Sequence, residues 1–174
     1  MTVETPRLLI VLRHAKSAWP DVADRDRPLA ARGLRDAPAA GRWLRAAGCV
    51  PDAVLCSPAR RTQDTWELAA TELGTVPVPA YDERLYGASV PELLAVLHEV
   101  PRHVRCLLLV GHSPGVQELT LALAGEALGD TRERAEQKFP TSALALLAMG
   151  GTWAQAHEGS AVLTDFVVPR GPKG

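Results

Sequence analysis

The sequence predicts a three-layer α/β sandwich, with a mainly parallel sheet between two layers of helices. Short continuous apolar runs are typical of strands that are buried on both faces of a sheet. Longer stretches with helical spacing separate these runs, and such alternation is typical of a parallel sheet covered by helices. A length of 174 residues fits one compact domain, so we expect residues 1–174 to form a single domain.

Five apolar runs are the expected strands of this sheet. They cover residues 8–12, 53–56, 106–110, 143–149 and 161–168. A sixth and weaker candidate is the short segment 76–78, which contains a proline. The last two runs can pair with the sheet in either direction.

Four helices are expected between the strands. They cover residues 31–47, 59–73, 89–97 and 113–123. In the first of them, Leu34, Ala37 and Leu44 recur at the spacing of a buried helix face. Pro38 lies inside this stretch and predicts either a kink or a later start of the helix. The segment 126–141 is polar and predicts a loop.

The charge balance and the cysteines exclude several classes of protein. A formal net charge of −1 lacks the positive excess of nucleic-acid binders. No apolar run approaches the roughly 20 residues of a membrane-spanning helix, so no membrane partner is expected. The run 8–12 stops at Arg13 and does not resemble a signal peptide. Cys49, Cys56 and Cys106 show no C-x-x-C spacing, which favours free thiols in a reducing cytoplasm and no thiolate zinc site.

Three polar clusters directly follow three of the expected strands. They are Arg13-His14-Ala15-Lys16-Ser17, Ser57-Pro58-Ala59-Arg60-Arg61 and Gly111-His112-Ser113-Pro114-Gly115. In an open α/β sheet, ligands bind beyond the carboxyl ends of the strands. The topology therefore brings two histidines and at least two arginines into one crevice. Helices that start there favour an anion, because their first backbone N–H groups point at it.

The composition of this crevice suggests chemistry on a phosphoryl group. Guanidinium groups bind phosphate oxygens in bidentate fashion. A neutral imidazole can attack phosphorus as a nucleophile, and a second histidine can donate to an oxygen that gains negative charge. The sequence has no glycine-rich Walker loop, so nucleotide-driven transfer is not indicated and no cofactor is expected.

At these residues the chain resembles the histidine phosphatase superfamily, also called the phosphoglycerate mutase-like or RHG family. Within it, the chain is most similar to the short SixA-like phosphohistidine phosphatases. Beyond the three clusters, the resemblance includes Arg27-Pro28-Leu29 with Arg32-Gly33, Arg61 with Thr62 and Thr65, and Glu83-Arg84-Leu85-Tyr86. A lone Arg-His pair is not specific for this family. The ordered set of motifs is specific, because it is spread over nearly the whole chain.

The resemblance implies a role for each matching residue. His14 is the nucleophile and becomes phosphohistidine, Arg13 and Arg61 hold the phosphate oxygens, and His112 completes the pocket. Glu83 lies where the mutase-like branch carries its general acid. The resemblance also implies the phosphoglycerate mutase-like fold and a reaction that needs no metal.

Two further positions bear on substrate binding. Ser17 follows the nucleophile closely and is a candidate donor to the phosphate. Ala15 replaces the glycine of the RHG triplet, a form that SixA-like members often show. The chain is also short of insertions between its strands, which implies an open site. Such a site suits a phosphorylated side chain on another protein.

We therefore predict a protein phosphohistidine phosphatase whose partner is a phosphorylated protein. The alternatives are a phosphatase of small phosphomonoesters, a mutase on the same fold and a non-catalytic phosphoprotein-binding module. Residue by residue, His14 could be structural, and Glu83 could be a solvated surface acid. A zinc site on His14 and His112 would need a third ligand, which no motif supplies. Arg60 is expected on the surface, and the four tryptophans are expected in packing roles.

Overall fold

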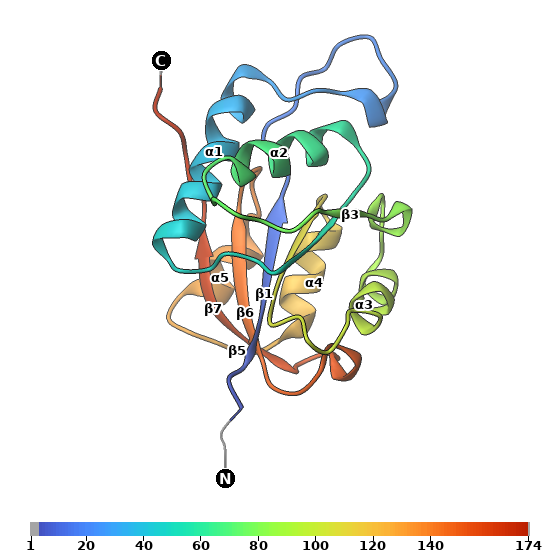
Figure 1. Ribbon diagram of the computed structural model, residues 1–174, viewed down its shortest axis with the longest axis vertical. Helices are drawn as coiled ribbons and strands as arrows, with labels where there is room; N and C mark the ends of the chain where they lie inside the picture. The colour runs from blue at the N-terminus through green and yellow to red at the C-terminus, as the bar shows by residue number, and fades with distance from the viewer. Residues whose placement is uncertain (1–3, 174) are drawn as a thin grey trace.

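A seven-stranded sheet runs through the centre of the protein, and helices cover both of its faces (Figure 1). The structure is a computed structural model that describes residues 4–173. Its strands are β1 (Arg7–Arg13), β2 (Ala53–Cys56), β3 (Ala80–Tyr81), β4 (Cys106–Gly111), β5 (Ala124–Ala127), β6 (Leu144–Met149) and β7 (Ala161–Val167). They are arranged in the order β3-β2-β4-β1-β6-β7-β5. The strand β6 runs against both of its neighbours, whereas the other pairs in the sheet are parallel.

Five helices flank the sheet. They are α1 (Ala31–Ala46), α2 (Arg60–Ala70), α3 (Val90–His98), α4 (Gly115–Leu123) and α5 (Thr131–Gln137). The side chains of α1 and α2 pack on one face of the sheet, and those of α3, α4 and α5 pack on the other. The predicted α/β class with a mainly parallel sheet is confirmed. None of the helices described is long and apolar enough to cross a membrane.

The strand β1 shows why the predicted strands are apolar at nearly every position. Leu9 and Val11 belong to the core under α3 and α4, while Ile10 and Leu12 belong to the core under α1 and α2. All four side chains are fully buried. A strand that buries both faces cannot alternate with polar residues, so it appears in the sequence as an unbroken apolar run.

The face that α1 buries differs from the prediction. Leu34 was expected on the buried face, but it is exposed. The buried stripe begins one residue earlier, at Gly33, and continues through Ala37 and Leu44. Pro38 lies in the interior of α1 and does not mark its start.

Two predictions on loops and strands were wrong. The segment 76–78 forms no strand, and pairing begins only at β3, because Pro77 and Pro79 have no N–H to donate to a ladder. The segment 126–141, expected as a loop, contains the end of β5 and the helix α5. This helix buries only Thr131 and Ala135, so its apolar periodicity is too weak to recognise in the sequence.

The sheet order brings the three polar clusters together. Strands β2, β4 and β1 are neighbours and parallel, and their last residues lie side by side. Cys56 pairs with Val110, and Arg13 pairs with Gly111. The residues that follow these strands therefore meet at one edge of the sheet.

Candidate active site

His14 directly follows β1 and is held in place by its own backbone. Its N–H donates to the carbonyl of Gly111 at 3.1 Å, and the next N–H, of Ala15, donates to Oγ1 of Thr65 at 2.9 Å. The imidazole Nδ1 lies 2.7 Å from the carbonyl oxygen of Ala15. Because a carbonyl only accepts, Nδ1 carries the proton. The other nitrogen, Nε2, therefore has a free lone pair.

The surroundings of His14 keep its imidazole neutral. The residue is only 6% exposed, and this burial is the main reason that its pKa falls from 6.5 to about 3. The positive charges of Arg61 and Arg13 lower the pKa further, while the hydrogen bond to Ala15 opposes the shift. At neutral pH the side chain is thus uncharged.

His112 follows β4 and faces His14. The centroids of the two imidazole rings are 5.4 Å apart. Its Nε2 lies 2.7 Å from Oγ of Ser57, the first residue after β2, and the ring of Tyr86 meets it edge-on at 5.5 Å. Burial, followed by the positive charge of Arg61, lowers the pKa of His112 to about 4. This second imidazole is therefore also neutral at pH 7.

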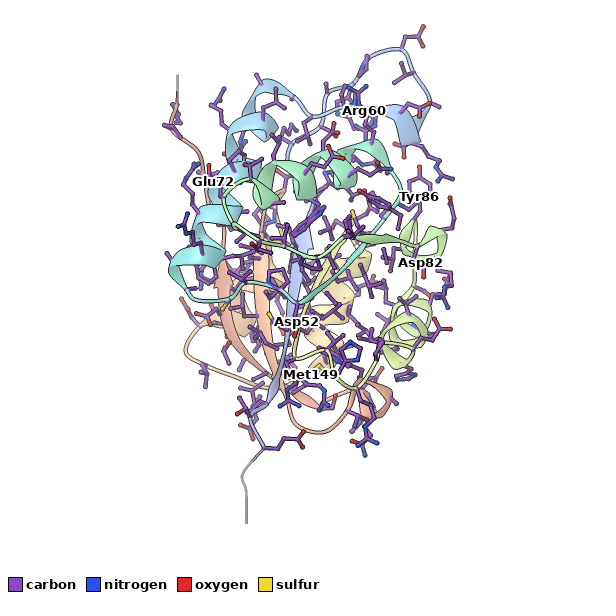
Figure 2. The ribbon with its side chains drawn as sticks, viewed as in Figure 1. Asp52, Arg60, Glu72, Asp82, Tyr86 and Met149 are labelled. Atoms are coloured by element: carbon purple, nitrogen blue, oxygen red, sulfur yellow. The ribbon has the colours of Figure 1, made fainter. Side chains whose placement is uncertain are left out.

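Arg60 and Arg61 occupy opposite environments on the first turn of α2. Arg61 is buried, and its guanidinium donates to the backbone carbonyl of Asp24 at 2.8 Å and to the Asp24 carboxylate at 3.1 Å. Arg60 is exposed and pairs with Asp64 on the same helix at 3.5 Å. In Figure 2, Arg60 and Tyr86 lie in the upper half of the molecule, toward which β1 points in Figure 1.

Arg13 is the last residue of β1 and reaches toward the loop before β6. Its guanidinium donates to the carbonyl oxygen of Phe139 at 2.9 Å. Burial lowers the pKa of this guanidinium. The side chain thus carries a positive charge that is only partly solvated.

Three buried nitrogen atoms around His14 have no hydrogen-bond partner within the described chain. They are Nε of Arg13, Nε of Arg61 and Nδ1 of His112. A buried polar group without a hydrogen bond costs about 1–3 kcal/mol, and such groups are rare in folded proteins. Here they belong to the residues that were predicted to hold a phosphate.

Ser17 and Glu83 lie around this centre without touching it. Oγ of Ser17 is buried and accepts a hydrogen bond from Arg27 at 2.8 Å. The Glu83 side chain is 71% exposed and pairs with Arg25 at 2.9 Å. In the part of the chain that the structure describes, neither side chain contacts His14 through a hydrogen bond.

A comparison with protein families shows to which superfamily the chain belongs. The model of the histidine phosphatase superfamily (branch 1) matches residues 9–141, which include both histidines and both arginines. The chain belongs to the histidine phosphatase superfamily. Its α/β fold and its seven-stranded, mostly parallel sheet are those of the phosphoglycerate mutase-like fold.

Individual relatives extend this assignment. An uncharacterized protein of Mycobacterium tuberculosis is 47% identical over 163 residues, which cover 91% of this chain and all of that protein. The solved structure of a candidate phosphohistidine phosphatase SixA from Nakamurella multipartitia has a TM-score of 0.85 and 31% identity, covering 95% and 98% of the two chains. A second such SixA structure, from Agrobacterium tumefaciens, has a TM-score of 0.79 and 28% identity, covering 95% and 100%.

Two residues that the sequence analysis did not single out contact the residues around His14. Asp24 receives hydrogen bonds from Arg61, Arg27 and the hydroxyl of Tyr86, and these bonds lower its pKa to about 2. Ser57 orients His112. Ser57 opened one of the polar clusters, so its place after β2 was an available signal, whereas nothing in the sequence marked Asp24.

The backbone of Ser142 holds the end of β1 and His14 in place. Its N–H donates to the carbonyls of both Arg13 and His14, at 3.2 and 3.1 Å. Ser142 has a φ of 66°, which is rare for a residue with a side chain. Such conformations persist only where the surroundings hold them, and they cluster at functional sites.

The prediction for Trp19 was wrong. The side chain does not pack in a core but is 76% exposed. The guanidinium of Arg27 stacks on its ring, 3.6 Å from the ring centre. Trp19 therefore covers part of the Arg27 guanidinium.

Within residues 4–173, no group of three or more His, Cys, Asp or Glu side chains is placed to hold a metal ion.

Proposed function

We propose that this chain is a SixA-type protein phosphohistidine phosphatase that acts through a covalent phosphohistidine on His14. The observation that carries this proposal is the set of three unpartnered buried nitrogen atoms, on Arg13, Arg61 and His112, around a neutral imidazole. A phosphoryl group has oxygens to accept all three hydrogen bonds, and its charge matches the two arginines. We also propose that residues 1–174 act as one domain in the cytoplasm.

The first step transfers the phosphoryl group to His14. Nε2 attacks phosphorus in line with the bond from phosphorus to the substrate nitrogen, so that a new P–N bond forms as the old one breaks. Because Nδ1 of His14 already donates to the Ala15 carbonyl, the phosphorylated imidazolium that forms is oriented and its positive charge is partly balanced. Arg13 and Arg61 stabilise the charge on the non-bridging oxygens.

His112 is proposed to donate to one of these oxygens. Oγ of Ser57 accepts the N–H of Ala59 at 3.4 Å and has its own proton to donate to Nε2 of His112. With the Ser57 hydroxyl as the donor in this proposal, the imidazole proton lies on Nδ1, which is the buried nitrogen without a partner. Ser17 is proposed to support the phosphate site through its hydrogen bond with Arg27.

The second step returns the enzyme to its starting state. Water attacks the phosphorus of phospho-His14, and the P–N bond breaks with its electron pair returning to Nε2. The inorganic phosphate that is released keeps the protons of the water. We propose that Glu83 serves as the acid and base at the mouth of the site, after leaving its exposed pair with Arg25. Phosphohistidine makes a small demand on such an acid, because a histidine leaving group departs neutral once its other nitrogen carries a proton.

An open site supports a protein substrate. The segments between β2 and α2 and between β4 and α4 are only residues 57–59 and 112–114, so neither of them carries an inserted element. A small sugar phosphate needs enclosure to be held by its non-reacting part. A phosphohistidine on a protein instead brings its own binding surface.

A substrate panel tests this proposal. The enzyme is treated with EDTA and given a phosphohistidine protein, several sugar phosphates and an aryl phosphate. We expect kcat/KM to be highest for the phosphohistidine protein and to survive the chelator. Equal or better turnover of one sugar phosphate would favour the small-molecule phosphatase or the mutase. Binding of the phosphoprotein without turnover of any substrate would identify a binding module.

A further inference from the structure

A hollow lined by positive charge adjoins the candidate active site and shares a wall with it. It has a volume of about 230 Å³, and its cationic side chains are Arg13, Lys16, Arg32, Lys138 and Arg170. Among the described residues that line it, none is acidic. Arg13 is also a proposed phosphate ligand, so an anion in this hollow would lie beside the transferred phosphoryl group.

The positive charge continues along α1 into a neighbouring hollow of about 390 Å³. This second hollow shares Arg32 and Arg170 with the first and adds Arg35 and Lys173. We call the seven cations of the two hollows the cationic trough. All three lysines of the chain lie in it, although the whole chain has a formal net charge of −1. Figure 1 shows the C-terminal segment running beside α1 toward the end of the molecule where β1 ends.

The buried carboxylate of Asp36 holds two arginines of the cationic trough in place. Oδ2 of Asp36 accepts from Arg32 at 3.3 Å and from Arg170 at 2.9 Å, and its Oδ1 accepts from the N–H of Gly171 at 2.9 Å. The Asp36 side chain is 3% exposed. Arg170 also donates to the carbonyl of Thr141 at 2.9 Å. A single negative charge thus holds two arginines in place and leaves a positive surplus.

The cations nearest the active site have no acidic partner. Among residues 4–173, none of Arg13, Lys16 and Lys138 forms an ion pair. Like charges that gather in a hollow repel one another and focus the electrostatic potential there. A bound anion would relieve this repulsion and would be drawn toward the phosphate site.

We propose that the cationic trough binds acidic side chains that flank the phosphohistidine of a substrate protein, an inference that rests on the proposed phosphatase function. The trough spans two hollows, which is more than one additional phosphate on a small molecule would fill. Among the described residues that line it, none is an aromatic side chain on which nucleic-acid bases would stack. Complementary charge across an interface speeds encounter and selects partners.

Two synthetic phosphohistidine peptides test this inference. One carries aspartates on both sides of the phosphohistidine, and its matched partner carries serines. We expect wild-type kcat/KM to favour the acidic peptide roughly 10-fold at low ionic strength and to lose this preference as salt is added. The variant Lys16→Gln/Lys138→Gln should bring the ratio of the two kcat/KM values close to one. Both side chains are exposed and unpaired, so the fold should tolerate the change.

The control is Arg45→Gln/Arg102→Gln, which removes the same charge from exposed positions. Arg45 lies in the last turn of α1, roughly 20 Å along the helix axis from Arg32. Arg102 precedes β4, at the edge of the sheet where that strand begins. This control variant should keep the wild-type ratio.

Three results would overturn the inference while leaving the phosphatase proposal intact. The first is an unchanged peptide ratio in Lys16→Gln/Lys138→Gln. The second is a preference for a sugar bisphosphate over its monophosphate that depends on the same lysines, since the second anion would then be a phosphate on a small molecule. The third is stronger competition by a single-stranded oligonucleotide than by the acidic peptide. Failure of the wild type to hydrolyse either peptide would instead overturn the phosphatase proposal, and this inference with it.

Discussion

Arg60 and Arg61 are adjacent in sequence, yet only Arg61 turns its guanidinium toward the two histidines. Arg61 is buried with an unpartnered Nε, whereas Arg60 is exposed beside Asp64. We expect Arg61→Ala to lower kcat/KM at least about 10²-fold, because a charged contact to the transition state is lost. Arg60→Ala should stay within a few fold. Similar losses in the two variants, measured by steady-state kinetics, would contradict the assigned orientation of α2.

The role of Glu83 can be tested by comparing the effect of one substitution on different substrates. Glu83→Gln should slow an alkyl phosphate much more than a phosphohistidine substrate, because an alkoxide leaves only with a proton donor. An aryl phosphate should fall between the two. General acid catalysis typically contributes 10²–10⁴-fold, so the order should be easy to resolve.

The Glu83 measurement must follow the chemical step by single turnover, since slow hydrolysis of phospho-His14 would hide the difference. Equal losses on all three substrates would assign Glu83 to positioning the attacking water. No loss on any substrate would leave it as an exposed acid paired with Arg25.

At the scale of elements, α1 and α2 approach each other closely at one glycine. A Cβ atom added to Gly41 would lie 2.2 Å from the backbone carbonyl oxygen of Ala69. We expect Gly41→Ala to lower the free energy of unfolding by roughly 1–3 kcal/mol, because the helices must separate. The control is Gly150→Ala, whose added Cβ would meet no atom within 4 Å. Equal urea midpoints for the two variants would show that the helices are not in such close contact.

Elements with a strong apolar pattern could be predicted from the sequence, and those held by tertiary contacts could not. The strand β1 is apolar on both faces and was found almost to the residue. By contrast, α5 buries two small residues and contacts a distant strand through Arg134, which donates to the carbonyl of Phe166 in β7 at 2.7 Å. The two-residue strand β3 pairs with the sheet only at Leu55 and Cys56. Neither α5 nor β3 has a strong apolar pattern of its own in the sequence, because each depends on contacts with other elements of the fold.

The candidate site also contains residues that could be predicted from the sequence and residues that could not. His14, Ser57 and His112 follow strands, so the sheet topology alone places them together. Asp24 and Tyr86 lie on loops, and their distance from Arg61 depends on how those loops fold. Sequence reasoning therefore found the groups proposed for chemistry but not the residues that hold them.

For the whole molecule, two buried neutral histidines make stability depend on pH. The folded-state pKa values are about 3 for His14 and about 4 for His112, each lowered from 6.5. Between pH 6.5 and pH 4 the unfolded chain therefore binds protons that the folded protein does not. Stability is full above pH 6.5 and is lost as the pH falls, by up to about 1.4 kcal/mol per pH unit for each imidazole.

Urea unfolding at about pH 7, 6 and 5 measures how the free energy of unfolding depends on pH. We expect His112→Gln to reduce the slope of stability against pH, and His14→Asn/His112→Gln to reduce it further. The slope is compared within each variant, so an overall loss of stability does not affect the result. A slope that stays at the wild-type value in the double variant would show that these imidazoles are not buried and neutral.

The central claim is that His14 carries the phosphoryl group during turnover. Rapid quenching with labelled phosphohistidine protein tests it most directly. We expect a phosphoenzyme that is labile in acid and stable in base, with the label on the peptide that contains His14. The variant His14→Ala should form none and should not turn over. An acid-stable label on another residue such as Ser17, or full activity of His14→Ala, would contradict the mechanism.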